Sequence, residues 1–311
     1  MFRLQLGILY VFAGIAKLNY DWLILAQPLS IWFVSFREVP LVGWLFQLKE
    51  TAYVFSWAGA LYDLTIPFFL LWAPTRIWAY ITVVGFHFIT WLMFPIGMFP
   101  WVMMVFTWVF FPIAFHGKLV NAISARFLSV RNRVRAPRIS DEYSLKTSVS
   151  SFLHSFIPLV LVVFFVIQLF LPLRHFLYPG NLFWTEQGYR FSWRVMLMHK
   201  EGYGRFFVVD SKTKREMELP QQQFLTPIQL DQMLTQPDMI LQYSQLLYKE
   251  YNGKTLEFGN EKITLVQPEI QAEIYVTLNG RPSQLFVRKG KNLVTIKNDL
   301  KNRIWLEEFK K

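Results

Sequence analysis

Three ionisable side chains interrupt stretches of the sequence that are otherwise apolar: Lys17, Asp63 and His87. A charged group near the membrane core costs on the order of 2.5–3.5 kcal/mol, so such residues are functional by default. Because the three belong to three different apolar segments, they predict a site enclosed within a helical bundle. A proton or ion pathway through a transporter fits the same pattern and stays open.

Each of these residues also has a structural interpretation. Lys17 lies within a turn of its segment end, where its ammonium can snorkel to the lipid headgroups. A buried His87 stays neutral and can be satisfied by a neighbouring carbonyl, and Asp63 can bond to a helix end. No two of the five histidines are three or four residues apart, so we predict no metal site.

The composition is that of a membrane protein. The chain has 311 residues, of which 53% are hydrophobic, 18% aromatic and only 17% charged. Its net charge of +11 comes from basic residues in loops beside apolar segments, a pattern of membrane orientation rather than nucleic-acid binding. The absence of cysteine excludes disulfides and thiolate chemistry.

Five apolar segments are candidates to cross about 30 Å of hydrocarbon at about 1.5 Å per residue, although the first and shortest of them barely spans it. They are Leu4–Leu18, Ala52–Trp72, Ile77–Phe94, Ile96–Phe115 and Phe152–Leu173. The sequence therefore predicts a membrane α-helical bundle of about five transmembrane helices over residues 1–180. The basic loop 116–151 is placed in the cytoplasm by its arginines and lysines, which by alternation puts Lys17 and everything after Arg174 on the outer side.

Residues 181–311 have the composition of a soluble domain. Alternating patterns predict strands at 191–197, 205–209, 270–278 and 293–296, and Asn279-Gly280 is a hairpin signal. Residues 237–251 have apolar side chains at helical spacing after a proline. We expect an extracytoplasmic, mainly β domain with one or two helices.

Several motifs occur in an order that is specific to one family. Ala13-Gly14-Ile15-Ala16-Lys17-Leu18 is followed by Asp21-Trp22, then by Phe86-His87 and by Ile96-Gly97-Met98-Phe99. Further blocks are Gln168 to Pro172, Tyr189 to Met196, and Ile274 to Val276 with Asn279-Gly280-Arg281. Together they resemble the vitamin K-dependent γ-glutamyl carboxylase family, including its bacterial-type members with a horizontally transferred transmembrane (HTTM) domain.

The resemblance implies a lyase of the inner membrane. Family members oxidise a reduced naphthoquinone with O2 to its epoxide, and the strong base formed allows CO2 to add to a peptide glutamate. The implied co-substrate is reduced vitamin K or a related quinone, and the implied partners are membrane lipid, this lipid-soluble quinone and a glutamate-containing protein. For bacterial-type members the resemblance implies the epoxidation, and whether they also carboxylate glutamate stays open.

The lysine that acts as the base in the family corresponds to Lys17. This agrees with the functional role that its position in an apolar segment already indicates. Apolar surroundings favour the neutral amine, the form that accepts a proton. His87 matches a family histidine and is expected to line the substrate site together with Asp63, Trp22 and Phe99.

The chain departs from the family pattern in several ways, two of which concern the lysine helix. Ala16 stands where the family has a second lysine, and the helices that precede the lysine helix in animal members have no counterpart here. A start codon upstream of Met1, or a truncated and inactive homologue, is therefore one alternative to an active enzyme. A non-catalytic, membrane-anchored binding protein is the remaining alternative.

Overall fold

The computed structural model describes residues 1–128, 151–259 and 261–310. These residues form two compact units. The helical unit contains Met1–Gly14 and Leu61–Phe170, and the mixed unit contains Ile15–Ala60 and Leu171–Lys311. Two helices, α1 (Phe2–Lys17) and α4 (Lys49–Leu71), contribute to both units. The predicted domain boundary at residue 180 stays a prediction.

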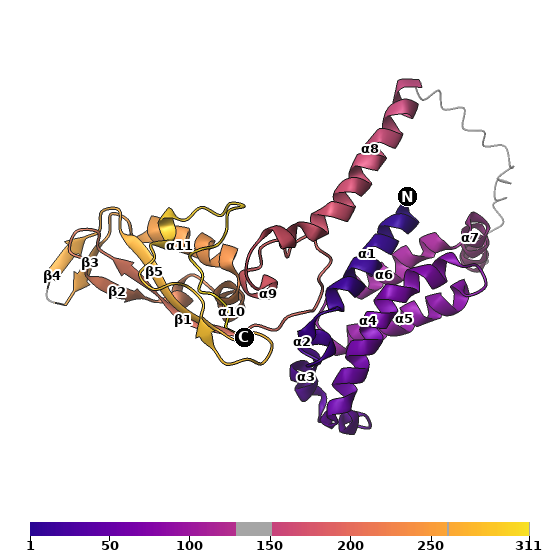
Figure 1. The fold of residues 1–311 in the computed structure, drawn as a ribbon, viewed down its shortest axis with the longest axis horizontal. Coiled ribbons are helices and arrows are strands. Elements are labelled where there is room, and N and C mark those ends of the chain that lie inside the picture. The colour runs from indigo at the N-terminus through magenta and orange to yellow at the C-terminus, as the bar shows by residue number, and fades with distance from the viewer. Residues whose placement is uncertain (129–150, 260, 311) are drawn as a thin grey trace. The chain divides into compact units, whose positions relative to one another are not determined.

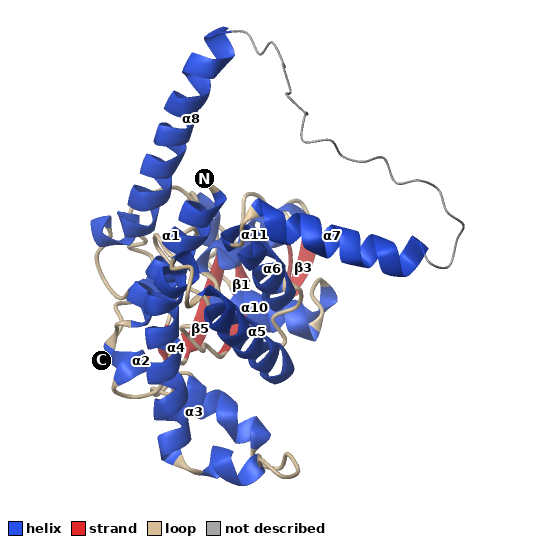
Figure 2. Cartoon of the chain, turned by 90° about the vertical axis from the view of Figure 1, so that its right-hand side faces the viewer, coloured by secondary structure: helices blue, strands red, loops and turns tan. Residues whose placement is uncertain are grey.

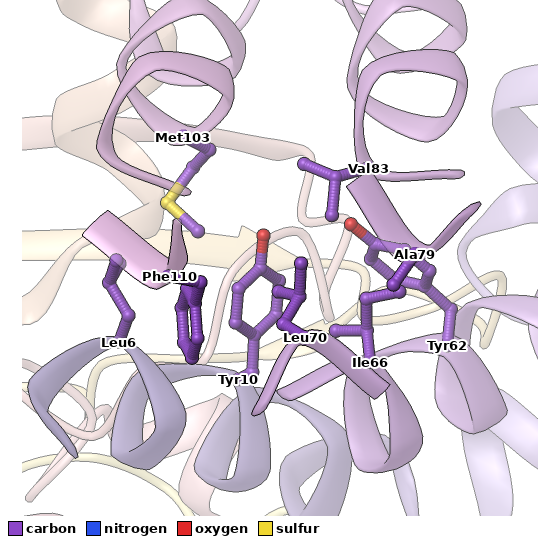
Figure 3. Close-up of a cluster of buried hydrophobic side chains, with 9 residues drawn as sticks. All are labelled: Leu6, Tyr10, Tyr62, Ile66, Leu70, Ala79, Val83, Met103 and Phe110. Atoms are coloured by element: carbon purple, nitrogen blue, oxygen red, sulfur yellow. The ribbon is translucent and has the colours of Figure 1, made fainter. Parts of the chain in front are cut away.

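The helical unit is built on α1 and α4 together with α5 (Arg76–Met93) and α6 (Phe99–Phe106), as Figure 1 shows. The 3-10 turn η3 (Thr107–Phe110) continues α6, and α7 (Ile113–Leu128) and α8 (Ser151–Phe170) follow in the chain. In α4, Tyr62, Ile66 and Leu70 recur every fourth residue, so they share one face of the helix. That face packs into a buried cluster made of Leu6, Tyr10, Tyr62, Ile66, Leu70, Ala79, Val83, Met103 and Phe110 (Figure 3).

Three helical segments among the described residues are long and apolar enough to cross a membrane: Lys49–Leu71, Arg76–Met93 and Phe156–Leu177. The last combines α8 with the 3-10 turn η4 (Leu171–Leu177). The segment α1 has 16 residues and is therefore about 24 Å long. The predicted single span Ile96–Phe115 is wrong, because the helix begins only after Gly97, at positive φ, and ends before Pro112.

The predicted basic loop 116–151 is helical in its first part, since α7 extends to Leu128. Residues 129–150 of that loop lie outside the described residues. Between α1 and α4 the chain forms short elements, namely α2 (Tyr20–Leu23), α3 (Leu29–Trp32), η1 (Phe33–Phe36) and η2 (Gly43–Gln47).

The mixed unit contains an antiparallel sheet in the order β2-β1-β5-β6. Its strands are β1 (Gly202–Val209), β2 (Glu216–Leu219), β5 (Glu269–Val276) and β6 (Gln284–Leu285). A separate hairpin pairs β3 (Thr255–Phe258) with β4 (Glu261–Thr264). Figure 2 shows these strands in red, and within the described part of the chain they occur only from Gly202 onwards.

Helices α10 (Pro227–Thr235) and α11 (Pro237–Tyr251) pack on β1 and β5 (Figure 1). Side chains of β5 alternate between buried and half-buried, as expected for a strand covered on one face. In the core, Phe206 of β1 meets Tyr243 of α11 edge-on at 5.0 Å between ring centroids. Short helical turns, α9 (Leu182–Thr185), η5 (Gln221–Gln223) and η6 (Leu293–Thr295), complete the unit.

The predicted fold class is confirmed: a helical region with candidate membrane spans precedes a mainly sheet domain with two long helices. The helix predicted at 237–251 and the strands at 205–209 and 270–278 are present. The strand predicted at 191–197 is wrong, because Phe191, Trp193 and Met196 have positive φ and break the alternation. The strand at 293–296 is also wrong, since Asn292 caps a 3-10 turn there.

Candidate functional site

Lys17 is the last residue of α1, and it is buried, with 7% of its surface exposed. The chain turns sharply after it because the Asn19 side chain caps α2, accepting from the Trp22 N–H at 3.0 Å. The same amide donates to the Ala16 carbonyl at 2.9 Å, which ties the turn back to α1. This turn places the Lys17 ammonium 5.5 Å from the centroid of the Trp22 ring. Such a cation–π contact contributes about 0.5–2 kcal/mol.

Trp22 is also held by hydrogen bonds to the first half of α4. Its indole N–H donates to the Ser56 carbonyl at 2.8 Å, and the Ser56 hydroxyl donates to the Trp22 carbonyl. Gly59, one turn further along α4, faces the same pair: a Cβ there would lie 3.7 Å from Trp22 Cζ2 and 4.0 Å from Lys17 Cε. The lysine stem is therefore enclosed by an aromatic ring and by the backbone of α4.

Asp21, one residue before Trp22, is bound to the turn that follows β5. Its carboxylate accepts from Arg281 Nη1 at 2.9 Å and Nη2 at 2.5 Å, and from Asn279 Nδ2 at 2.8 Å. Both Asp21 and Asn279 are buried. The carboxylate hydrogen bonds hold the pKa of Arg281 above its ordinary value.

The helical unit holds a second group of polar side chains, around His87 of α5. His87 is buried, and its Nε2 lies 3.3 Å from the Tyr10 hydroxyl. The Tyr62 ring meets that of Tyr10 edge-on at 6.0 Å and stacks on Phe86 at 4.0 Å. Figure 3 shows the two tyrosines in the cluster. Among the described residues, the buried Tyr62 hydroxyl has no hydrogen-bond partner.

The predicted site residues fall into two groups. Lys17 and Trp22 are together in the mixed unit, whereas Asp63, His87 and Phe99 belong to the helical unit. The His87 and Phe99 rings are 6.2 Å apart, and Asp63 is buried in the same unit. His87 contacts a tyrosine hydroxyl rather than a carbonyl. A single site that unites all five residues stays a prediction.

Three polar residues of these groups were not predicted from the sequence: Tyr10, Tyr62 and Ser56. A tyrosine hydroxyl in an apolar helix needs a partner when it is buried, and this was the available signal for the first two. Ser56 gave no signal, because its contact is with a residue 34 positions away. Among the residues that the structure describes, no group of three or more His, Asp and Glu side chains is arranged to hold a metal ion.

Comparison with known proteins identifies two family domains along the chain. Residues 1–115 match the HTTM domain, and residues 153–311 match the lumenal domain of vitamin K-dependent gamma-carboxylase. No solved structure matches the chain. The second match covers about half of the sequence, and the two occur in the order that the motifs indicated. With its apolar helices, the chain is a carboxylase-like membrane protein with an extracytoplasmic domain, and it belongs to the vitamin K-dependent gamma-carboxylase family.

Proposed function

We propose that this chain is an inner-membrane enzyme that oxidises a reduced naphthoquinone with O2 to its epoxide, with Lys17 as general base. The proposed second step uses the base so formed to carboxylate a peptide glutamate with CO2. Family membership supports the reaction class. The observation that carries the role of Lys17 is its burial at the end of α1 against the Trp22 ring.

These surroundings suit a group that accepts a proton and then holds the charge. As the general base, Lys17 would take the quinol proton on its side-chain nitrogen, which is held in a buried position at the end of α1. Once Lys17 is protonated, the electron-rich face of the Trp22 indole stabilises the positive charge. Ser56 accepts a hydrogen bond from the indole N–H and donates one to the backbone carbonyl of Trp22, so the ring is held in place and this stabilisation needs no rearrangement.

The helical unit has side chains that fit a quinone ring. A flat bicyclic ring with two oxygen substituents needs aromatic walls and polar groups at its edges, which is the usual composition of a small-molecule site. The stacked Tyr62 and Phe86 rings supply a wall, and the Tyr62 hydroxyl is a donor with no partner among the described residues. The quinone supplies the redox chemistry, while His87 and Phe99 are proposed to line its site with Asp63.

Membranes that contain the parent or a Lys17 variant test the proposal through epoxide formation from added naphthohydroquinone and O2. Lys17→Ala removes the amine, and Lys17→Arg keeps a cation that does not act as a base at neutral pH. Both should lose at least about 100-fold in kcat, the lower end of general-base contributions. Lys49→Ala, at an exposed lysine that begins α4, is the matched control and should stay within twofold of the parent.

Parent-like activity in either Lys17 variant would eliminate the role of the base. Absence of epoxide with the parent, across menaquinol- and phylloquinol-type substrates, would overturn the proposed function. Incorporation of labelled CO2 into a glutamate-containing peptide, measured in the same membranes, decides the carboxylation step. Co-fractionation with inner-membrane markers decides the location.

A further inference from the structure

The turn after β5 reaches a residue some 260 positions earlier in the chain. Arg281 donates hydrogen bonds from both of its terminal nitrogens to the Asp21 carboxylate, and the Asn279 side chain donates a third from the same turn. A buried carboxylate is tolerated only when it is paired and hydrogen-bonded. The three donors meet this requirement, and the bidentate guanidinium also fixes the orientation of the carboxylate.

Asn279 can present its amide in only one way. Its Oδ1 accepts the His199 backbone N–H at 2.8 Å, which leaves Nδ2 to donate to Asp21. The Asn279 N–H donates in turn to the His199 carbonyl at 2.9 Å, so the backbone of the turn is anchored as well. Asn279 and Gly280 have φ values of +49° and +75°, which asparagine and glycine adopt at low cost.

A short chain of contacts connects this turn to Lys17. Asp21 is followed directly by Trp22, whose ring lies against the Lys17 ammonium and whose indole N–H is bound to Ser56. The Asp21 carbonyl also accepts the Gln27 N–H at 2.8 Å, which closes the segment on itself. If Asp21 loses its anchor, the residues that cover Lys17 are released on one side.

We infer that Asn279 and Arg281 are positioning residues that act through Asp21 and Trp22 to hold the Lys17 side chain in its buried place. The inference deepens the proposed function, since it names residues of the lumenal-type domain that keep the base in position. The burial of Lys17 that it explains can also be measured without an activity assay.

The test measures how fast an amine-reactive reagent labels Lys17 in the purified full-length protein, with peptide mass spectrometry as the readout. Arg281→Lys removes the bidentate pairing but keeps the charge. Asn279→Gly removes the amide but suits the positive φ. Arg205→Lys is the matched control, because Arg205 contacts two carboxylates on the exposed face of the sheet at 3.3 Å each.

Lys200 serves as an internal reference for the fold. Its ammonium is paired with Glu186 at 2.7 Å, and only 4% of its side chain is exposed. We expect Arg281→Lys and Asn279→Gly to increase Lys17 labelling at least about fivefold, with Lys200 labelling unchanged, and Arg205→Lys to leave both as in the parent. Unchanged Lys17 labelling in both variants would overturn the inference. So would a parallel rise at Lys200, which would indicate general unfolding.

Kinetics give a second, separable readout. In the epoxidation assay, the two variants should lower kcat by about tenfold or more while the KM for the quinol stays within twofold, because the base is displaced and the ring site is intact. A rise in KM with kcat unchanged would contradict a positioning role. If the parent forms no epoxide, the proposed function fails, whereas the labelling experiment still decides the inference.

Discussion

Hydrogen-bond partners distinguish two buried tyrosines that otherwise have similar surroundings. The Tyr10 hydroxyl is 3.3 Å from His87 Nε2, whereas the Tyr62 hydroxyl has no partner among the described residues. Both rings belong to the buried cluster of the helical unit in Figure 3. A buried hydroxyl without a partner lowers the stability of the folded protein, because its desolvation is not compensated by a hydrogen bond. The oxygen of a bound ligand can supply the missing partner.

The pair gives a matched test of this difference. Tyr10→Phe should destabilise the protein by about 1 kcal/mol, because His87 loses its partner. Tyr62→Phe should leave stability unchanged or raise it, since it removes an unpaired hydroxyl. Thermal unfolding of the detergent-solubilised protein, followed by size-exclusion of a fluorescent fusion, checks both. Equal destabilisation by the two substitutions would show that Tyr62 has a structural partner.

At the scale of elements, a hydrogen-bonded turn joins strands β1 and β2 of the sheet. The β1–β2 connection is closed by Asp210, whose carboxylate accepts from the backbone N–H groups of Lys212 and Thr213 and from the Thr213 hydroxyl. The bonds from Thr213 are the main reason that the pKa of Asp210 lies below its usual value of 3.8. Lys214, in the same turn, has positive φ. The turn is therefore fixed by a charged acceptor.

This pKa shift predicts a dependence of stability on pH. The folded pKa of Asp210 is lowered, so its contribution is present above pH 3.8 and is lost as the pH falls through the folded pKa. Asp210→Asn should lower stability at neutral pH and flatten the decline below pH 3.8, which unfolding measurements between pH 2.5 and 6 can follow. Glu216→Gln, at an exposed position of β2, is the control. A parent-like acid profile in Asp210→Asn would contradict the role of the turn.

At the scale of the whole molecule, the absence of cysteine allows single-cysteine labelling of the two sides of the membrane. Asn298→Cys places a thiol on the C-terminal domain, and Lys118→Cys places one in the basic part of α7, both at exposed positions. A membrane-impermeant maleimide applied to intact cells should label the first and not the second. After lysis it should label both. Labelling of both in intact cells would contradict the cytoplasmic placement of the basic segment.

Local patterns were sufficient for several elements. The helix Pro237–Tyr251 and the strand β5 could be predicted because apolar side chains recur with the period of each structure. The sequence also identified Lys17, Asp63 and His87 as anomalies, because polar groups in apolar helices are recognisable without any contact information. All three are buried.

Other features depended on contacts or backbone conformations that a local pattern does not contain. Residues 191–197 alternate like a strand, but three positive φ values, which neighbours along the chain did not indicate, turn the backbone away. The single span predicted over 96–115 is shortened at both ends, because Gly97 has positive φ and Pro112 follows the end of η3.

The sequence by itself determined that this is a membrane protein with a lysine in an apolar segment and a separate sheet domain, because composition and periodicity follow directly from the solvent that each segment meets. Only the tertiary structure decided what surrounds that lysine. Asp21 and Arg281 are 260 residues apart, and Trp22 and Ser56 are 34 apart. Such pairs are selected by packing and by the need to satisfy buried polar groups, which arise only when distant segments meet.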